Sequence, residues 1–500
     1  MPRTQRLRLD NVVTSMAELG PTIPDGGYSW LVFLGIIMIQ ITVPSVLSMY
    51  GVVLSYLHSD SEPDIYLWKG SVTLTPILFT AFWSLADPWS RTIVNLATVP
   101  RFVGLTGVAL LAIGILASGY LETGGVGAYL ARLSAGAVMG IGASTVLLQS
   151  ENLLRRHFRT RLVLVLTLKR ISFSLGIAMM PGYAYMLLQN TGLQTGLLLL
   201  STALLPGILG ACAFDAPVLQ RTTPYRLLIS EEDNELSIRE TPDETLSFPN
   251  LEEEFRNETE ENDGTTTGEP IPTPLFSEGS NSYSYDEPED DINLFVTPSG
   301  SSTTTWLEEF RSLRLIKFWS AVVTWFSIKG CAFSLLVLSP SMAMTQGQGF
   351  TTLGQSVTLT TVIGLGTFLP GAASIWSPKT ARWRSVYFGT MCWLGSAALW
   401  GIVSSSKHVW FLLWAFVGGV SIGGCSVAEE SALRDLLGAK GANRALRGLS
   451  TIVGLALLFL IFIEDFSTCL RIVSIAELVG GGYWILTPCF GALRARWPQR

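Results

Sequence analysis

Twelve long apolar runs constrain this chain more than any other feature of its sequence. Each run has about 20 residues, the length that an α-helix needs to cross roughly 30 Å of hydrocarbon. Only 14% of the residues are charged, against roughly 25% in soluble proteins. The sequence therefore predicts an all-α polytopic membrane protein with twelve transmembrane helices. The approximate bounds of the runs are 30–56, 70–94, 102–121, 127–150, 162–188, 193–216, 316–339, 352–376, 385–404, 408–430, 445–463 and 470–489.

The basic residues of the short loops predict how the helices are oriented. Lys and Arg collect on the cytosolic side of a membrane protein. Most loop cations lie on the same side as the N-terminus, and the exceptions are Lys69, Lys407 and Arg471. We therefore expect both termini to be cytosolic.

A polar insert divides the runs into two sets of six. More than half of the 39 acidic residues lie between 220 and 310, among many Ser, Thr and Pro. Such a segment has too few apolar residues to form a core, so we interpret it as disordered and cytosolic. The expected organisation is a cytosolic segment 1–29, a six-helix bundle 30–219, an acidic linker 220–315, a second six-helix bundle 316–489 and a cytosolic tail 490–500.

Two sets of six spans joined by a cytosolic linker resemble the major facilitator superfamily. The halves of these carriers rock about a substrate site near the bilayer midplane. Small residues that let helices approach closely recur in the fourth and tenth runs. They are Gly136, Gly140 and Gly142 in the fourth run, and Gly418, Gly419, Gly423 and Gly424 in the tenth.

The segment PDGGYSW, directly before the first run, resembles a signature of the proton-linked monocarboxylate transporter family. That signature combines an acidic residue, Gly, Gly or Ser, an aromatic residue, a small residue and Trp. The matching residues are Asp25, Gly26, Gly27, Tyr28, Ser29 and Trp30.

Two further segments resemble the same family in part. HFRTRLVLVLTLKRISFSLG opens the fifth run with an aromatic residue and the basic Arg159 and Arg161. RDLLGAKGAN, which contains Asp435, follows the tenth run. In the fifth run, Leu and Val largely replace the Ala/Gly spacing of the family.

The resemblance implies a plasma-membrane solute carrier that works by alternating access. Its substrates would be small monocarboxylates such as pyruvate, lactate or short-chain acids, carried with or without protons. Relatives carry aromatic amino acids, iodothyronines, creatine or carnitine, and a single-span ancillary protein is a potential partner. The lipid bilayer is the other expected partner.

The chain departs from the lactate carriers where they bind the anion and the proton. Ser48 occupies the position of their first-span lysine, and the eighth run contains no counterpart of their Asp/Arg pair. A carboxylate brought out of water needs a cation or several hydrogen-bond donors. Either another cation has taken over, or the substrate is not a simple anion.

Intramembrane cations are the candidates for that role, because charges in a bilayer usually face the protein interior. Lys329 lies about 20 Å into the seventh run at 1.5 Å per residue. It is our first candidate for a carboxylate contact, with a lysine snorkelling outward as the alternative. Lys169 and Arg170 lie about 13 Å into the fifth run. One of them is a candidate to face the pathway, with helix packing or stabilisation at the membrane interface as the alternative.

Other polar residues are expected to line the pathway or to control access to it. Ser48 and Tyr50 are candidate lining residues of the first span, although such a stripe also suits hydrogen bonding between helices. Asp87 and Arg91 suit an ion pair of the inner gate better than a proton relay.

Three further charged residues carry weaker expectations. Asp25 is expected to pair with Arg159 or Arg161 of the loop after the fourth span. Arg132 suits a structural or gating role, and Glu477 suits a protonated or locally paired state.

Motifs of other function classes are missing from the sequence. There is no Walker motif, no Ser/His/Asp or metal-ligand spacing, and only three histidines. We expect neither an enzyme, nor a cofactor, nor nucleic-acid binding. The alternatives are a proton-independent facilitator of a neutral or zwitterionic solute, and a non-transporting receptor or scaffold whose acidic linker binds partners.

Overall fold

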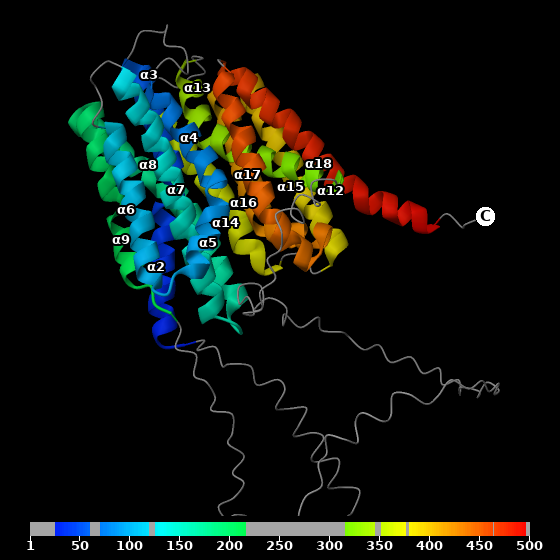
Figure 1. Cartoon of the computed structure of the whole chain (residues 1–500). Helices are drawn as coiled ribbons and strands as arrows, with labels where there is room; N and C mark the ends of the chain where they lie inside the picture. The colour runs from blue at the N-terminus through cyan, green and yellow to red at the C-terminus, as the bar shows by residue number, and fades with distance from the viewer. Residues whose placement is uncertain are drawn as a thin grey trace, which may run out of the picture. The chain divides into compact units, whose positions relative to one another are not determined.

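The described residues form helices almost throughout (Figure 1). The computed structural model describes residues 26–60, 71–119, 126–216, 316–345, 352–376, 380–463 and 465–496. All of them belong to one compact unit, which comprises 23–219 and 292–500. Asp25 and the predicted linker 220–315 lie outside the described residues.

The helices of the N-terminal half are broken where Pro or Gly interrupts the backbone pattern. Pro44 lies between the first two helices, and Gly192 adopts a φ of 77° inside α8. Proline lacks the backbone N–H of a helix interior, and a positive φ favours Gly. The elements are α2 (Tyr28–Thr42), α3 (Val46–Asp60), α4 (Ser71–Leu85), α5 (Asp87–Leu96), α6 (Pro100–Gly119), α7 (Val126–His157), α8 (Leu162–Leu200), η1 (Ser201–Leu204) and α9 (Leu205–Cys212).

The C-terminal half begins with a helix that passes through a π-helical segment, η3. π-Helical segments of this kind are rare in proteins, and many of those that occur lie at functional sites. The elements are α12 (Ile316–Phe333), η3 (Ser334–Leu338), α13 (Ser339–Thr345), α14 (Leu353–Ala373), η4 (Ser374–Trp376), α15 (Ala381–Ser404), α16 (His408–Leu437), α17 (Ala439–Leu458), η5 (Phe459–Phe462) and α18 (Phe466–Arg496).

Helices occupy all twelve predicted runs. Within the described residues, 10 helical segments are long and apolar enough to cross a membrane. One of them, Leu162–Cys212, covers two predicted runs, and Leu74–Leu85 is a shorter apolar helix in the second run. The predicted all-α polytopic architecture is confirmed, whereas the number of crossings and the position of the termini stay predictions.

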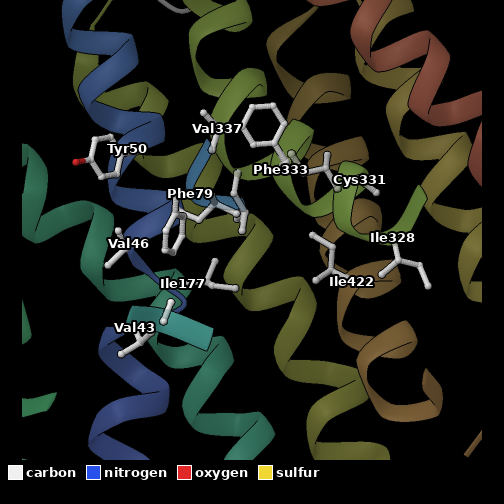
Figure 2. Packing of buried hydrophobic residues seen from close by; sticks show 14 of the residues in the cluster. Val43, Val46, Tyr50, Phe79, Ile177, Ile328, Cys331, Phe333, Val337 and Ile422 are labelled. Atoms are coloured by element: carbon white, nitrogen blue, oxygen red, sulfur yellow. The ribbon is translucent and has the colours of Figure 1, made fainter. Parts of the chain in front are cut away.

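Helices of the two halves pack directly against each other. α8 runs along α14, and α4 runs along α17. The backbones of α3 and η3 are so close that a Cβ on Gly51 would overlap the carbonyl oxygen of Leu336. Figure 2 shows Phe79 and Ile177 of the N-terminal half in one buried cluster with Val337 of the C-terminal half. Groups on these facing helices are therefore placed to act together.

Candidate functional site

Two acid–base pairs occupy matching positions near the ends of α7 and α16. Glu151 and Arg155 (ENLLR) are spaced like Glu430 and Arg434 (ESALR), and each helix ends within two turns after its Glu. Arg155 Nη2 lies 3.6 Å from Glu151 Oε1, and Arg434 Nη2 lies 2.8 Å from Glu430 Oε1. Residues four apart are neighbours on a helix. The repeated ExxxR spacing was the available sequence signal, and our sequence analysis missed it.

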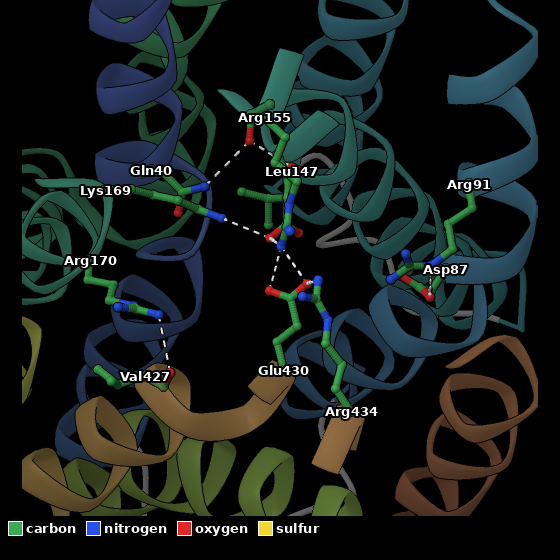
Figure 3. A network of polar contacts seen from close by, with 12 residues as sticks. Gln40, Asp87, Arg91, Leu147, Arg155, Lys169, Arg170, Val427, Glu430 and Arg434 are labelled. Carbon is green, nitrogen blue, oxygen red and sulfur yellow. Dashed lines mark hydrogen bonds and ion pairs between the residues drawn. The ribbon is translucent and has the colours of Figure 1, made fainter. Parts of the chain in front are cut away.

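The two pairs are joined across the halves of the chain. Arg155 of α7 forms an ion pair with Glu430 of α16, and Lys169 Nζ of α8 lies 3.5 Å from Glu151 Oε1. Figure 3 shows charges of alternating sign that connect α8, α7 and α16. We call this chain of residues, Lys169, Glu151, Arg155, Glu430 and Arg434, the inner-end network. The inner end is the end at which α7 and α16 terminate, and the sequence predicts that it faces the cytosol.

Two more contacts close the inner end. Arg170 Nη2 donates to the carbonyl oxygen of Val427 on α16 at 3.2 Å. The predicted pair of Arg91 and Asp87 is present, with 2.8 Å between Nε and Oδ2. Ser450 of α17 donates to the same Asp87 oxygen at 3.0 Å. The hydrogen bonds of Arg170 to Val427 and of Ser450 to Asp87 therefore join the N-terminal half to the C-terminal half.

Lys329 lies on α12 and faces α4 of the other half. Its Nζ is 5.4 Å from the centroid of the Trp83 ring, a distance at which a cation is attracted to the ring face. Among the described residues, Lys329 forms no ion pair. Two buried hydroxyls, Thr75 on α4 and Ser334 on η3, lack a hydrogen-bond partner in the described part of the chain.

The first-span candidates, Ser48 and Tyr50, make their contacts within the N-terminal half. Ser48 Oγ donates to the carbonyl oxygen of Ser45 in its own span at 2.8 Å. The Tyr50 hydroxyl lies 2.7 Å from Ser118 Oγ on α6 and 3.7 Å from Met139 Sδ on α7. In Figure 2, Tyr50 points away from Val337. The structure does not bring these two residues to Lys329.

The first and second motif segments meet at the inner end. Trp30 packs edge-on against Phe158, with 5.3 Å between the ring centroids, and Arg161 lies 5.9 Å from the Trp30 ring. Ser29 Oγ lies 3.0 Å from His157 Nδ1. Gly27 begins the helix with a φ of 60°, which explains a Gly at this position.

The other motif residues have separate surroundings. The Tyr28 hydroxyl donates to the carbonyl oxygen of Ala213 at 3.1 Å. Asp435 accepts two hydrogen bonds from Arg384, at 2.8 and 2.7 Å, which join α15 to α16. The predicted pairing of Asp25 with Arg159 or Arg161 falls outside the described residues, as does the side chain of Arg132.

Comparisons with known proteins identify the fold. No protein-family model and no curated protein matches the sequence. A solved peptide transporter, POT, in complex with sulfate is similar to this chain, with a TM-score of 0.58 and 11% identity over 96% of this chain and 99% of that chain. A POT family transporter in complex with 5-aminolevulinic acid has a TM-score of 0.57 and 13% identity over 94% of this chain and 98% of that chain.

A POT family transporter in complex with a thioalcohol conjugated peptide is similar to the same degree. Its TM-score is 0.56, with 13% identity over 94% of this chain and 96% of that chain. Identities this low are informative about the fold alone, and they do not show the monocarboxylate transporter family. The chain is an all-α polytopic membrane protein with the major facilitator superfamily fold that its sequence predicts.

Proposed function

We propose that the chain is a secondary transporter that moves a small monocarboxylate across the plasma membrane by alternating access. The observation that carries the proposal is Lys329, whose ammonium group lies between the two halves and contacts the Trp83 ring. A carboxylate that leaves water needs such a cation. Lys329 is free to supply it, because it makes no ion pair within the described residues.

In this proposal the inner-end contacts act as a gate. Alternating access requires the two halves to separate first at one end and then at the other. Opening the inner end would break the pair of Arg155 with Glu430, the bond of Arg170 to Val427, and the contact of Ser450 with Asp87. Arg170 makes one of these contacts, and Lys169 pairs with Glu151 next to Arg155 within the N-terminal half. We therefore assign Lys169 and Arg170 to the gate and Lys329 to the substrate.

A zwitterionic solute is the second candidate substrate. The interface between the halves contains acidic groups, Glu151 and Glu430, as well as cations. A solved transporter of the same fold is described in complex with 5-aminolevulinic acid, which has an amine and a carboxylate. Such a solute would use both signs of charge.

Uptake into proteoliposomes tests the proposal. The purified protein is reconstituted, and labelled pyruvate, lactate, butyrate, an aromatic amino acid and creatine are supplied with and without an inward proton gradient. We expect uptake of at least one monocarboxylate. Uptake of creatine or the amino acid alone would favour the zwitterion candidate. Uptake of no solute would contradict transport and favour a receptor or scaffold.

A further inference from the structure

A carboxyl group lies inside the C-terminal half, apart from the inner-end network. Glu477 is on α18, roughly 17 Å along the helix from Phe466 at 1.5 Å per residue. That distance is about half the thickness of a hydrocarbon core of roughly 30 Å. The side chain is 1% exposed. An acidic residue at this depth needs a physical explanation, because ionisable groups in a membrane are costly.

The neighbouring helices leave space for this carboxyl group. A Cβ added to Gly395 of α15 would overlap both Glu477 Oε1 and Ser421 Oγ of α16. A side chain at position 395 would therefore displace the carboxyl group. Ser421 Oγ donates to the carbonyl oxygen of Met391 at 2.7 Å, so its proton is already used. Its lone pairs remain available to accept a hydrogen bond.

The side chain that interacts with the carboxyl group is a weak hydrogen-bond donor. The group that interacts with Glu477 is the thiol of Cys331 on α12. The second carboxyl oxygen, Oε2, has no hydrogen-bond partner within the described part of the chain. An ionised carboxylate would need charge-assisted bonds at both oxygens to replace its water.

The titratable groups around Glu477 are thiols. They are Cys331 on α12, Cys425 on α16, and Cys392 on α15, whose Sγ lies 3.8 Å from that of Cys425. Lys329 is two residues from Cys331, but its ammonium group contacts Trp83 of the other half. η3, which also packs on α18, contains no titratable residue.

Other charges on α18 or at its start are more than a turn away. Asp465 and Arg471 each precede Glu477 by more residues than one helical turn contains. In the ranges that the structure describes, no Lys, Arg or His pairs with Glu477. A charged carboxylate would thus be buried without compensation, which costs several kcal/mol. The neutral acid is the form that fits this site.

We infer that Glu477 is a proton-binding site of the transport cycle, which holds one proton while the C-terminal half is packed as seen here and releases it when water reaches the site. The inference rests on the proposed transport function for its role in coupling. The first part of the inference, that Glu477 is a neutral carboxylic acid at neutral pH, does not depend on any substrate.

One face of α16 connects the site to the inner end. Ser421, Cys425 and Glu429 are spaced four residues apart, so they share a face of the helix. Ser421 and Cys425 are buried, whereas Glu429 is partly exposed and interacts electrostatically with Cys425. A proton released by Glu477 therefore has a polar stripe that leads toward the inner-end network on the same helix.

Infrared spectroscopy tests the bound proton directly. The difference spectrum of wild type minus Glu477→Gln at neutral pH is expected to show the C=O stretch of a protonated carboxylic acid. Asp465→Asn is the matched control. Partial burial acts to raise the pKa of Asp465, but hydrogen bonds from Ser467 and Thr468 outweigh it and hold that pKa below its ordinary value. Its removal should therefore leave the acid band unchanged.

A second variant keeps the spectroscopic test decisive if Glu477→Gln fails to fold. Gly395→Ala places a methyl group against the carboxyl oxygen, so we expect the acid band of Glu477 to shift. A carboxylate band for Glu477 at neutral pH would overturn the inference. An acid band that neither variant alters would belong to another residue and would overturn it equally.

Transport assays test the role of this proton in coupling. The assay uses whichever solute of the uptake experiment the wild-type protein transports into proteoliposomes. Glu477→Gln is expected to lose accumulation of this solute driven by the proton gradient. It should retain exchange of labelled for unlabelled solute when the pH is equal on both sides. Retained gradient-driven accumulation would refute the coupling role. If the wild-type protein carries no solute, the transport proposal fails, and the infrared band alone decides whether Glu477 holds a proton.

Discussion

Two buried polar sites, one around Tyr50 and one around Glu477, differ in their chemistry. In the N-terminal half, Tyr50 lies within hydrogen-bond distance of Ser118 on a neighbouring helix, and neither group is charged at neutral pH. In the C-terminal half, Glu477 interacts with the thiol of Cys331, and its Oε2 has no hydrogen-bond partner in the described chain. Neutral groups whose hydrogen bonds are made stabilise a single arrangement of the helices. A buried carboxyl group with an oxygen that lacks a hydrogen bond can instead change its protonation when water or pH changes. The proton-dependent step of the proposed transport cycle is therefore expected at Glu477.

The largest effect on uptake is expected from substitution of Lys329, which lies in the C-terminal half like Glu477. Lys329→Ala should abolish uptake of anionic solutes, because it removes the cation that faces the other half. Lys329→Arg should retain part of the uptake. Uptake into proteoliposomes, corrected for the amount of reconstituted protein, measures the effect. Lys407→Ala, at an exposed position, is the control, and wild-type affinity in Lys329→Ala would exclude the carboxylate contact.

A charge swap tests the link between the halves. Glu430→Arg places a third cation beside Arg155 and Arg434 at the inner end, because both of these residues pair with Glu430. We expect an uptake rate lower by about tenfold, equivalent to about 1.4 kcal/mol in the balance of two conformations. The double variant Arg155→Glu/Glu430→Arg should recover most of the rate. If the double variant is as slow as Glu430→Arg, the pair does not act as a gate.

Substitution of two glycines by Ala compares a crowded position, Gly395, with an open one, Gly182. Gly395→Ala in the C-terminal half should lower the free energy of unfolding by about 1–3 kcal/mol, the usual cost of overpacking. Gly182→Ala in α8 meets no atom within 4 Å, and should be neutral or stabilising because Ala favours helix more than Gly does. Thermal unfolding of the purified protein in detergent measures both changes. Equal stability of the two variants would contradict the crowded carboxyl site.

The smallest effect is expected from Tyr50→Phe. The change removes the hydrogen bond to Ser118, and a typical bond of this kind contributes about 1 kcal/mol. The same unfolding assay should show this small loss, with uptake unchanged in proteoliposomes. Loss of uptake without loss of stability would return Tyr50 to the substrate site and weaken the contrast between the halves.

Much of the fold could be predicted because membrane spans are local features. The apolar runs and the helices that they form follow from segment length and composition. The pair of Asp87 and Arg91 could be predicted for the same reason, since residues four apart meet on one helix. The cross-half pair of Arg155 with Glu430 could not, because it joins residues 275 positions apart.

By itself, the sequence determined an all-α membrane protein, the positions of its apolar helices, and the helices on which its few intramembrane charges lie. Only the tertiary structure decided which charges meet, that Ser48 and Tyr50 bond within their own half, and that Glu477 lies against Gly395 and Cys331. The physical reason is that lipid is as apolar as a protein interior. Hydrophobicity therefore marks a segment as membrane-spanning without indicating which of its faces contacts another helix.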